Sequence, residues 1–209
     1  MKIYATQVGY IMTNCYLLCE EEAGVCALID PGEDADRLAQ MVESSGCALQ
    51  YILLTHGHYD HTMGVAGLLE HFPDVPVYIH RKDVVEPGVR DHLKFNRLES
   101  PNQRYYAEGD VLPLGSLTIT VWETPGHSAG SVCLLTDGVI FSGDTLFRAT
   151  CGRTDFPDGS YEDILRSLAR LGRLEGNYLV YPGHERQTEL DFERKFNPYM
   201  KQGLAMTQA

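Results

Sequence analysis

The sequence predicts an α/β fold in which two β-sheets pack face to face and helices cover their outer surfaces. Two blocks of short apolar segments, one in each half of the chain, are predicted strands. Each block also contains segments whose apolar residues recur at helical spacing. Because a sheet has to bury its apolar face against another layer, this order of strands and helices favours a layered sandwich.

The first block contains five predicted strands. They cover residues 3–8, 15–19, 25–29, 49–54 and 75–79. The fourth is a short apolar run that leads directly into Thr55 and His56. A buried strand is therefore expected to deliver a histidine at its carboxyl end.

Helices are expected between these strands. From Ala35 to Val42, apolar residues recur at positions i, i+3, i+4 and i+7, and a Ser-Gly pair ends the pattern. Apolar residues around Leu68 indicate a second helix. Residues 84–98 are predicted to form a helical stretch that is broken at Pro87-Gly88.

The second block contains four predicted strands and one helix. The strands cover residues 117–123, 132–136, 139–142 and 178–181. Asp137-Gly138 favours a hairpin turn between the second and third of them. Ser160 opens a sequence that resembles a capping box, and apolar residues from Ile164 to Leu171 continue it at helical spacing, so a helix is expected there.

Length and composition are those of one globular domain covering residues 1–209. The formal charge of −12, with 17 basic and 29 acidic residues, argues against a nucleic-acid partner. No secretory signal is recognisable, and no segment approaches the ~18 apolar residues of a membrane span, so a cytoplasmic location without membrane contact is expected. In that compartment the six cysteines are expected to be reduced.

The most informative motif is Thr55-His56-Gly57-His58-Tyr59-Asp60-His61. Imidazole nitrogens and carboxylate oxygens suit zinc and related ions, and a glycine lets a tight loop turn two imidazoles toward one point. His56 and His58 can therefore share one metal, while Asp60 and His61 can hold a second. Three further segments supply candidate ligands directly after predicted strands and beside a glycine. These ligands are His127, Asp144 and His184.

The ordered set H-x-H-x-D-H, P-G-H, G-D-T and P-G-H resembles the metallo-β-lactamase fold superfamily, from Thr55 to His184. The resemblance implies a four-layer αβ/βα sandwich with two divalent metal ions, zinc being the expected ion and iron or manganese the alternatives. The implied ligands are His56, His58 and His127 for the first metal, Asp60, His61 and His184 for the second, and Asp144 for both.

This constellation predicts a hydrolase. Two divalent ions would bring four positive charges, against three negative charges from Asp60, Asp144 and a bridging hydroxide. The remaining positive charge can polarise a carbonyl and stabilise an oxyanion. We therefore expect hydroxide attack on an ester-like carbonyl, with Asp60 and Asp144 as catalytic residues and no serine or cysteine nucleophile.

Within the superfamily, residues 143–147, 151–153 and 181–185 resemble the glyoxalase II (hydroxyacylglutathione hydrolase) group. This resemblance implies a thioester substrate on glutathione or a related thiol carrier. It places Arg153 where a cation grips the carrier's carboxylate; a surface salt bridge is the alternative role. Asp144 argues against a zinc β-lactamase, which usually carries cysteine at that position.

The sequence departs from larger glyoxalase II enzymes at several points. Arg186 and Asp155 stand where those enzymes carry aromatic residues. Only 25 residues follow His184, so the helical domain that completes the glutathione pocket in those enzymes is not expected here. These departures concern the part of the chain that would bind glutathione, and they leave the expected metal ligands unchanged.

Other functions fit parts of the same pattern. Residues 151–156 are equally similar to persulfide dioxygenases, which use a single iron, and a lactonase is a further alternative. A binding module without turnover would be expected to have lost a ligand, and all seven are present. His71, His80 and His92 are expected to be structural, although His92 lies between the ligand loops. The sequence does not indicate an oligomeric state.

Overall fold

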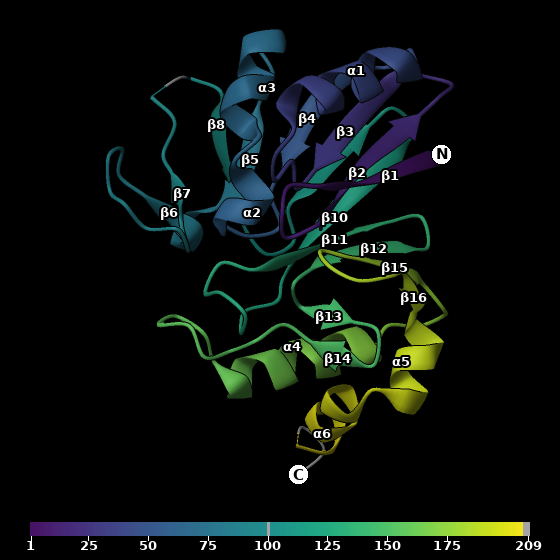
Figure 1. The fold of residues 1–209 in the computed structure, drawn as a ribbon. Helices are drawn as coiled ribbons and strands as arrows, with labels where there is room; N and C mark the ends of the chain where they lie inside the picture. The colour runs from purple at the N-terminus through teal and green to yellow at the C-terminus, as the bar shows by residue number, and fades with distance from the viewer. Residues whose placement is uncertain (100, 207–209) are drawn as a thin grey trace.

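The computed structural model describes residues 1–99 and 101–206, and two six-stranded sheets form its centre (Figure 1). The first sheet has the order β1 (Lys2–Val8), β2 (Thr13–Glu20), β3 (Val25–Ile29), β4 (Ala48–Leu53), β5 (Val77–His80) and β8 (Gln103–Tyr106). The second has the order β16 (Thr188–Glu189), β15 (Leu179–Pro182), β12 (Val139–Gly143), β11 (Val132–Thr136), β10 (Leu117–Glu123) and β9 (Val111–Leu114).

Helices cover both outer faces. Figure 1 shows α1 (Ala35–Ser45) and α3 (Val65–His71) on the first sheet, with the one-turn helix α2 (Tyr59–Thr62) at its edge. The helices α4 (Tyr161–Gly172), α5 (Leu190–Phe196) and α6 (Pro198–Met206) lie against the second sheet. The predicted four-layer αβ/βα sandwich is therefore confirmed.

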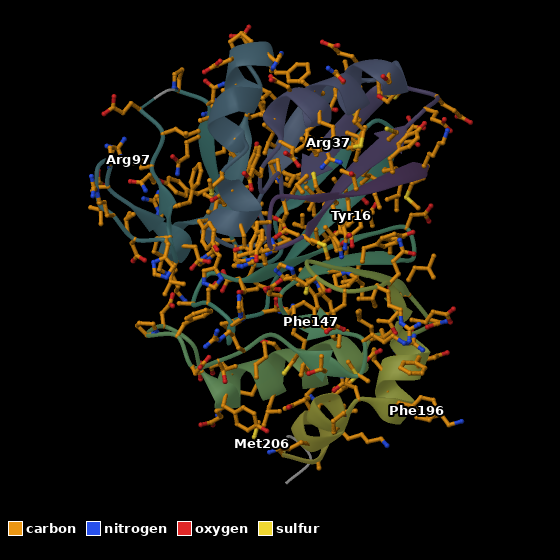
Figure 2. All side chains as sticks on the ribbon, viewed as in Figure 1. Tyr16, Arg37, Arg97, Phe147, Phe196 and Met206 are labelled. Carbon is orange, nitrogen blue, oxygen red and sulfur yellow. The ribbon has the colours of Figure 1, made fainter. Side chains whose placement is uncertain are left out.

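The alternation of side chains along β2 explains the layers. Cys15, Leu17 and Cys19 face the core under α1 and α3, whereas Tyr16 and Leu18 face the core between the sheets. Successive side chains of a strand point to opposite faces, so a strand with apolar residues at every position is buried on both sides. In Figure 2, Tyr16 lies at the junction of the two halves.

The strand directions bring the candidate ligand loops to one edge of the sandwich. β4 runs parallel to β3 and β5, and β15 runs parallel to β12. Parallel strands end at the same edge of a sheet, which is where loops that carry function gather. Hydrogen bonds join the halves at this edge. The backbone amide of Asn14 donates to the carbonyl oxygen of Gly183 over 2.7 Å, and the hydroxyl of Tyr16 donates to the carbonyl oxygen of Pro182 over 2.7 Å.

The helical stretch predicted for residues 84–98 is wrong. The segment forms two short parallel strands, β6 (Val84–Val85) and β7 (Phe95–Asn96), joined by turns. Proline cannot donate a backbone hydrogen bond, and Gly88 adopts a φ of 83°, which ends any helix there. The chain then folds back so that the carbonyl of His92 accepts from the amide of Tyr59 over 3.0 Å.

A short strand pair and a 3₁₀ turn complete the fold. β13 (Leu146–Phe147) pairs with β14 (Thr150–Cys151), and a 3₁₀ turn covers Arg81–Asp83. The Ser160 hydroxyl accepts from the amide of Asp163, which confirms the predicted cap of α4. All six cysteines are free thiols. Across residues 1–99 and 101–206, no helix combines the length and apolar character needed to traverse a bilayer.

Candidate metal centre

The loop after β4 supplies four of the seven predicted ligands. His56 lies in a bend. His58 is extended and immediately precedes α2, whose single turn carries Asp60 and His61. Gly57 is required between the histidines because the loop passes close to a neighbour. A Cβ added there would lie 2.4 Å from the carbonyl oxygen of Asp83.

The other three predicted ligands follow strands of the second sheet. His127 comes after β10, Asp144 after β12 and His184 after β15. Gly183 allows the last of these loops to approach the site, since a Cβ at this position would lie 2.3 Å from Oδ1 of Asp144. The structure thus brings all seven predicted side chains together from four loops.

The first cluster consists of His56, His58 and His127, whose nearest ring nitrogens all lie within 4.8 Å of one another. Nδ1 of His58 is 2.9 Å from Nε2 of His127. All three side chains are buried. Three imidazoles that converge on one point form a donor set that suits a zinc-like ion.

The second cluster consists of Asp60, His61 and His184. Nε2 of His61 is 3.6 Å from Oδ2 of Asp60 and 3.3 Å from Nε2 of His184, which is itself 3.2 Å from that carboxylate oxygen. Ligands bound tetrahedrally at about 2.0–2.1 Å lie about 3.3 Å apart. The separations are therefore those of three ligands around one metal ion.

Asp144 lies between the two clusters. Its Oδ1 is 3.5 Å from Nε2 of His61. Its Oδ2 is 3.4 Å from Nε2 of His127 and 3.6 Å from Nε2 of His184. The carboxylate therefore lies close to rings of both clusters.

Unsatisfied polar atoms indicate that the clusters fit metal ions. The buried atoms Nε2 of His56 and Oδ1 of Asp144 have no hydrogen-bond partner, which is costly unless another group takes that place. Burial, followed by the neighbouring histidines, lowers the pKa of His56, and burial and His127 lower the pKa of His58 to about 4. Both rings are thereby kept neutral, as a metal ligand has to be.

The second cluster favours positive charge. Burial alone would lower the pKa of His61, but the carboxylates of Asp144 and Asp30 outweigh it and raise that pKa to about 9. Burial would raise the pKa of Asp60, but His184 and His61 outweigh it and hold that pKa below its ordinary value. A cation is therefore electrostatically favoured at this position.

Outer hydrogen bonds orient the rings. Oδ2 of Asp30 lies 3.0 Å from Nδ1 of His61 and accepts from the hydroxyl of Thr55 over 2.7 Å; that hydroxyl is 3.1 Å from Nδ1 of His56. Nδ1 of His127 is 2.8 Å from the carbonyl oxygen of Arg153. With Nδ1 engaged in this way, the Nε2 atoms of the three rings point at the centre.

Asp83 is a second supporting carboxylate, and like Asp30 it was not among the predicted site residues. It is fully buried and accepts from the amides of Gly57 and Gly130, each over 3.0 Å, and from the hydroxyl of Ser128 over 2.5 Å. It thereby ties the His56–His58 loop to the loop after His127. Lys94 supplies the countercharge at 2.9 Å.

A metal pocket of 540 Å³ opens in front of the ligands. Phe147, which Figure 2 places in the second-sheet half, lies on one side of it, with its ring centroid 6.1 Å from that of His184. Arg153 and Phe156, from the segment after β14, also line the pocket. Tyr59 and His92 line it from the segments after β4 and β6. The guanidinium of Arg153 is held by Asp155 through bonds of 2.6 and 2.7 Å.

The remaining histidines lie outside the ligand set. His71 is 2.8 Å from a carboxylate oxygen of Asp36, and His80 is 3.1 Å from that of Glu123. His92 is different, because it lines the metal pocket beside Tyr59.

Comparison with known proteins identifies the family. The sequence profile of the Metallo-beta-lactamase superfamily matches residues 8–184. The chain belongs to this superfamily. It is 34% identical to a probable metallo-hydrolase of Streptococcus pyogenes, over 95% of this chain and 90% of that protein. It is 32% identical to the hydroxyacylglutathione hydrolase GloC of Haemophilus influenzae, over 96% of this chain and 98% of that protein.

Solved structures of the superfamily share the fold. BLEG-1, a B3 metallo-beta-lactamase, matches with a TM-score of 0.84 and 30% identity, covering 95% of this chain and 99% of its own. ETHE1 from Myxococcus xanthus matches with a TM-score of 0.76 and 30% identity, covering 95% of this chain and 84% of its own. A third protein, solved in a di-iron-bound form, matches with a TM-score of 0.78 and 33% identity, covering 94% of this chain and 99% of its own. The superfamily and the His/Asp cluster together indicate a metallo-hydrolase that uses divalent metals.

Proposed function

We propose that this protein hydrolyses thioesters with the help of two divalent metal ions, most simply zinc, with iron or manganese as alternatives. The position of Asp144 is the observation that carries the proposal, since its carboxylate lies 3.5 Å from a ring of one cluster and 3.4 Å from a ring of the other. His56, His58 and His127 would hold one ion, Asp60, His61 and His184 the other, and Asp144 both.

The chemistry follows from charge and orientation. When bound, two divalent ions lower the pKa of water toward ~7 and stabilise an oxyanion. With metal bound, the ligand side chains would contribute only two negative charges, from Asp60 and Asp144, because an imidazole binds a metal ion in its neutral form. The hydroxyl of Thr13 donates to Oδ2 of Asp60 over 3.1 Å and fixes the direction of that carboxylate. The site therefore keeps an excess of positive charge at the reacting carbonyl.

The proposed reaction is the hydrolysis of a thioester by one water molecule. The oxygen of water forms a bond to the acyl carbon, the carbon–sulfur bond breaks, and the products are a carboxylic acid and a thiol. The similarity to a hydroxyacylglutathione hydrolase supports a thioester, and Arg153 at the pocket rim supports a carrier with a carboxylate. No nucleophilic side chain is needed.

Metal analysis and a substrate panel test this proposal. We expect two metal ions per chain by elemental analysis, and turnover of S-lactoylglutathione that disappears after exhaustive chelation and returns on adding metal. A lactone and a β-lactam serve as comparison substrates. Full activity after chelation, or turnover of only the comparison substrates, would contradict the proposal.

The competing activity is that of a persulfide dioxygenase with a single iron. Its support is the sequence of residues 151–156 and the similarity to ETHE1 from Myxococcus xanthus. Metal analysis under anaerobic conditions separates the two activities. One redox-active iron per chain, with oxygen consumption on a thiol persulfide, would favour the dioxygenase.

A further inference from the structure

A second cavity adjoins the metal pocket. It has a volume of 800 Å³ and is formed by α2, α3 and residues 88–98. Tyr59 and His92 line both cavities. Their ring centroids are 6.2 Å apart, and the amide of Tyr59 donates to the carbonyl of His92, so the two residues form the boundary between the cavities.

The lining of the second cavity is mainly apolar. Met63 and Val89 are 56% and 45% exposed, and Phe95 and Leu98 lie beside them in the wall. Large apolar side chains left open to water in a cavity favour an apolar ligand, because covering them removes apolar surface from water.

The charges in this cavity are offset. Burial alone would lower the pKa of Lys94, but the carboxylates of Asp83 and Asp158 outweigh it and raise that pKa. Both carboxylates are ion-paired with this ammonium group. Arg90 and Asp91 contribute opposite charges next to each other. The cavity therefore offers no surplus positive charge to the carboxylates of a carrier such as glutathione.

A thioester has an acyl arm and a thiol arm, and the two cavities differ in what they offer to each. Arg153 lines the metal pocket but not the second cavity, so the carboxylate of a thiol carrier would be attracted to the metal pocket. Tyr59 and His92 line both cavities, so an acyl chain that passes them enters the cavity that contains Met63 and Val89.

We propose that the second cavity binds the acyl chain of the substrate, and that the preferred substrates are thioesters of apolar acyl groups longer than lactoyl. This inference rests on the proposed thioesterase function.

The inference is tested by varying the length of the acyl chain while the thiol carrier stays the same. The acetyl, butyryl, hexanoyl and octanoyl thioesters of N-acetylcysteamine are compared on the metal-loaded protein. We expect kcat/KM to rise about two- to fourfold for each methylene that enters the cavity. Equal kcat/KM values for acetyl and octanoyl substrates would overturn the inference while leaving the thioesterase function intact.

A variant that fills the cavity sharpens the test. Ala66 is exposed on α3 and lines the second cavity but not the metal pocket, so Ala66→Leu adds bulk without disturbing a buried contact. We expect kcat/KM for the octanoyl substrate to fall about tenfold and that for the acetyl substrate to stay within about twofold. The matched control is Ala205→Leu, at an exposed alanine of α6. Equal losses on both substrates would overturn the inference.

Binding provides a readout that does not depend on turnover. Titration with octanoate should shift the NMR signal of the Met63 methyl group, and Ala66→Leu should weaken that shift. If no thioester is hydrolysed but octanoate still shifts this signal, the proposed function fails while the apolar cavity stands. Absence of the shift overturns the cavity assignment.

Discussion

Oδ2 of Asp30 lies 3.0 Å from Nδ1 of His61, and both side chains are almost completely buried. The same carboxylate accepts from the amide and the hydroxyl of Thr55, each over 2.7 Å. Because the hydroxyl in turn meets Nδ1 of His56, one carboxylate orients a ligand of each metal cluster. The direction of both rings therefore depends on an acid that is not itself one of the proposed ligands.

Asp30→Asn should weaken metal binding. The amide group cannot accept from both neighbours as the carboxylate does, so it would disturb the tautomer of His61. Loss of such a supporting partner typically costs about 10–100-fold in metal affinity or activity. Competition with a chromophoric chelator measures the affinity, and circular dichroism checks that the fold is retained.

Asp36→Asn is the matched control for that variant. Asp36 pairs with His71 on the surface, and its side chain is 89% exposed. The metal affinity of the Asp36→Asn variant should equal that of the wild type. Equal affinities for all three proteins would show that Asp30 has no role in orienting the ligands.

Asp144→Ala should reduce the metal content from two ions per chain to one or none and abolish hydrolysis. The carboxylate is the side chain whose oxygens face both clusters, so its loss opens each of them. Elemental analysis after gel filtration measures the content. Asp74→Ala, at an exposed position outside the metal pocket, serves as the control. Normal metal content and turnover in Asp144→Ala would refute the assignment of the ligands.

Asp83→Ala should lower both the free energy of unfolding and the catalytic activity. The change removes four hydrogen-bond or ion-pair contacts and leaves the half-buried Lys94 with only one carboxylate. Removing one partner of a buried ion pair costs about 3–5 kcal/mol. Urea denaturation measures the free energy of unfolding. Glu86→Ala, which breaks an exposed pair with Arg97, should cost less than about 1 kcal/mol; equal losses in the two variants would argue against a special role for Asp83.

The ligand loops could be predicted because the pattern that marks them is local. An apolar run ends in Thr55-His56, and the next residues repeat the same donor types within one loop, so neither distance nor topology is needed. Asp30 and Asp83 lie in other loops, and nothing in their neighbouring residues distinguishes them from surface acids. The only available signal was that Asp30 directly follows a predicted strand.

The fold was predictable where strands are continuously apolar and unpredictable where context decides. The predicted bounds of β3, β10 and β11 agree with the structure because these strands are bounded by clear turn residues. β9 contains Pro113, which a strand tolerates only at a sheet edge, so pairing rather than propensity forms it. The short pair β6–β7 likewise depends on contacts between segments about ten residues apart.

The pairing of Arg153 with Asp155 leads to a prediction about the carrier. Both side chains are exposed, and the guanidinium also lies 4.4 Å from the ring centroid of Phe156 at the pocket rim. Asp155 occupies the two donors that a carrier carboxylate would use. A bidentate bond between guanidinium and carboxylate is geometrically specific, so the internal acid and the substrate acid compete for one site.

Asp155→Asn should therefore lower KM for S-lactoylglutathione by about threefold, since Arg153 is then free to bind the carrier, whereas Arg153→Ala should raise KM by about tenfold with kcat nearly unchanged. Steady-state kinetics on this substrate and on acetyl-N-acetylcysteamine, which has no carboxylate, separate carrier binding from a general loss of activity. The neutral substrate should respond to neither change. If Arg153→Ala alters both substrates alike, or neither, the arginine acts only as the partner of Asp155, and the carrier's carboxylate has to be recognised elsewhere.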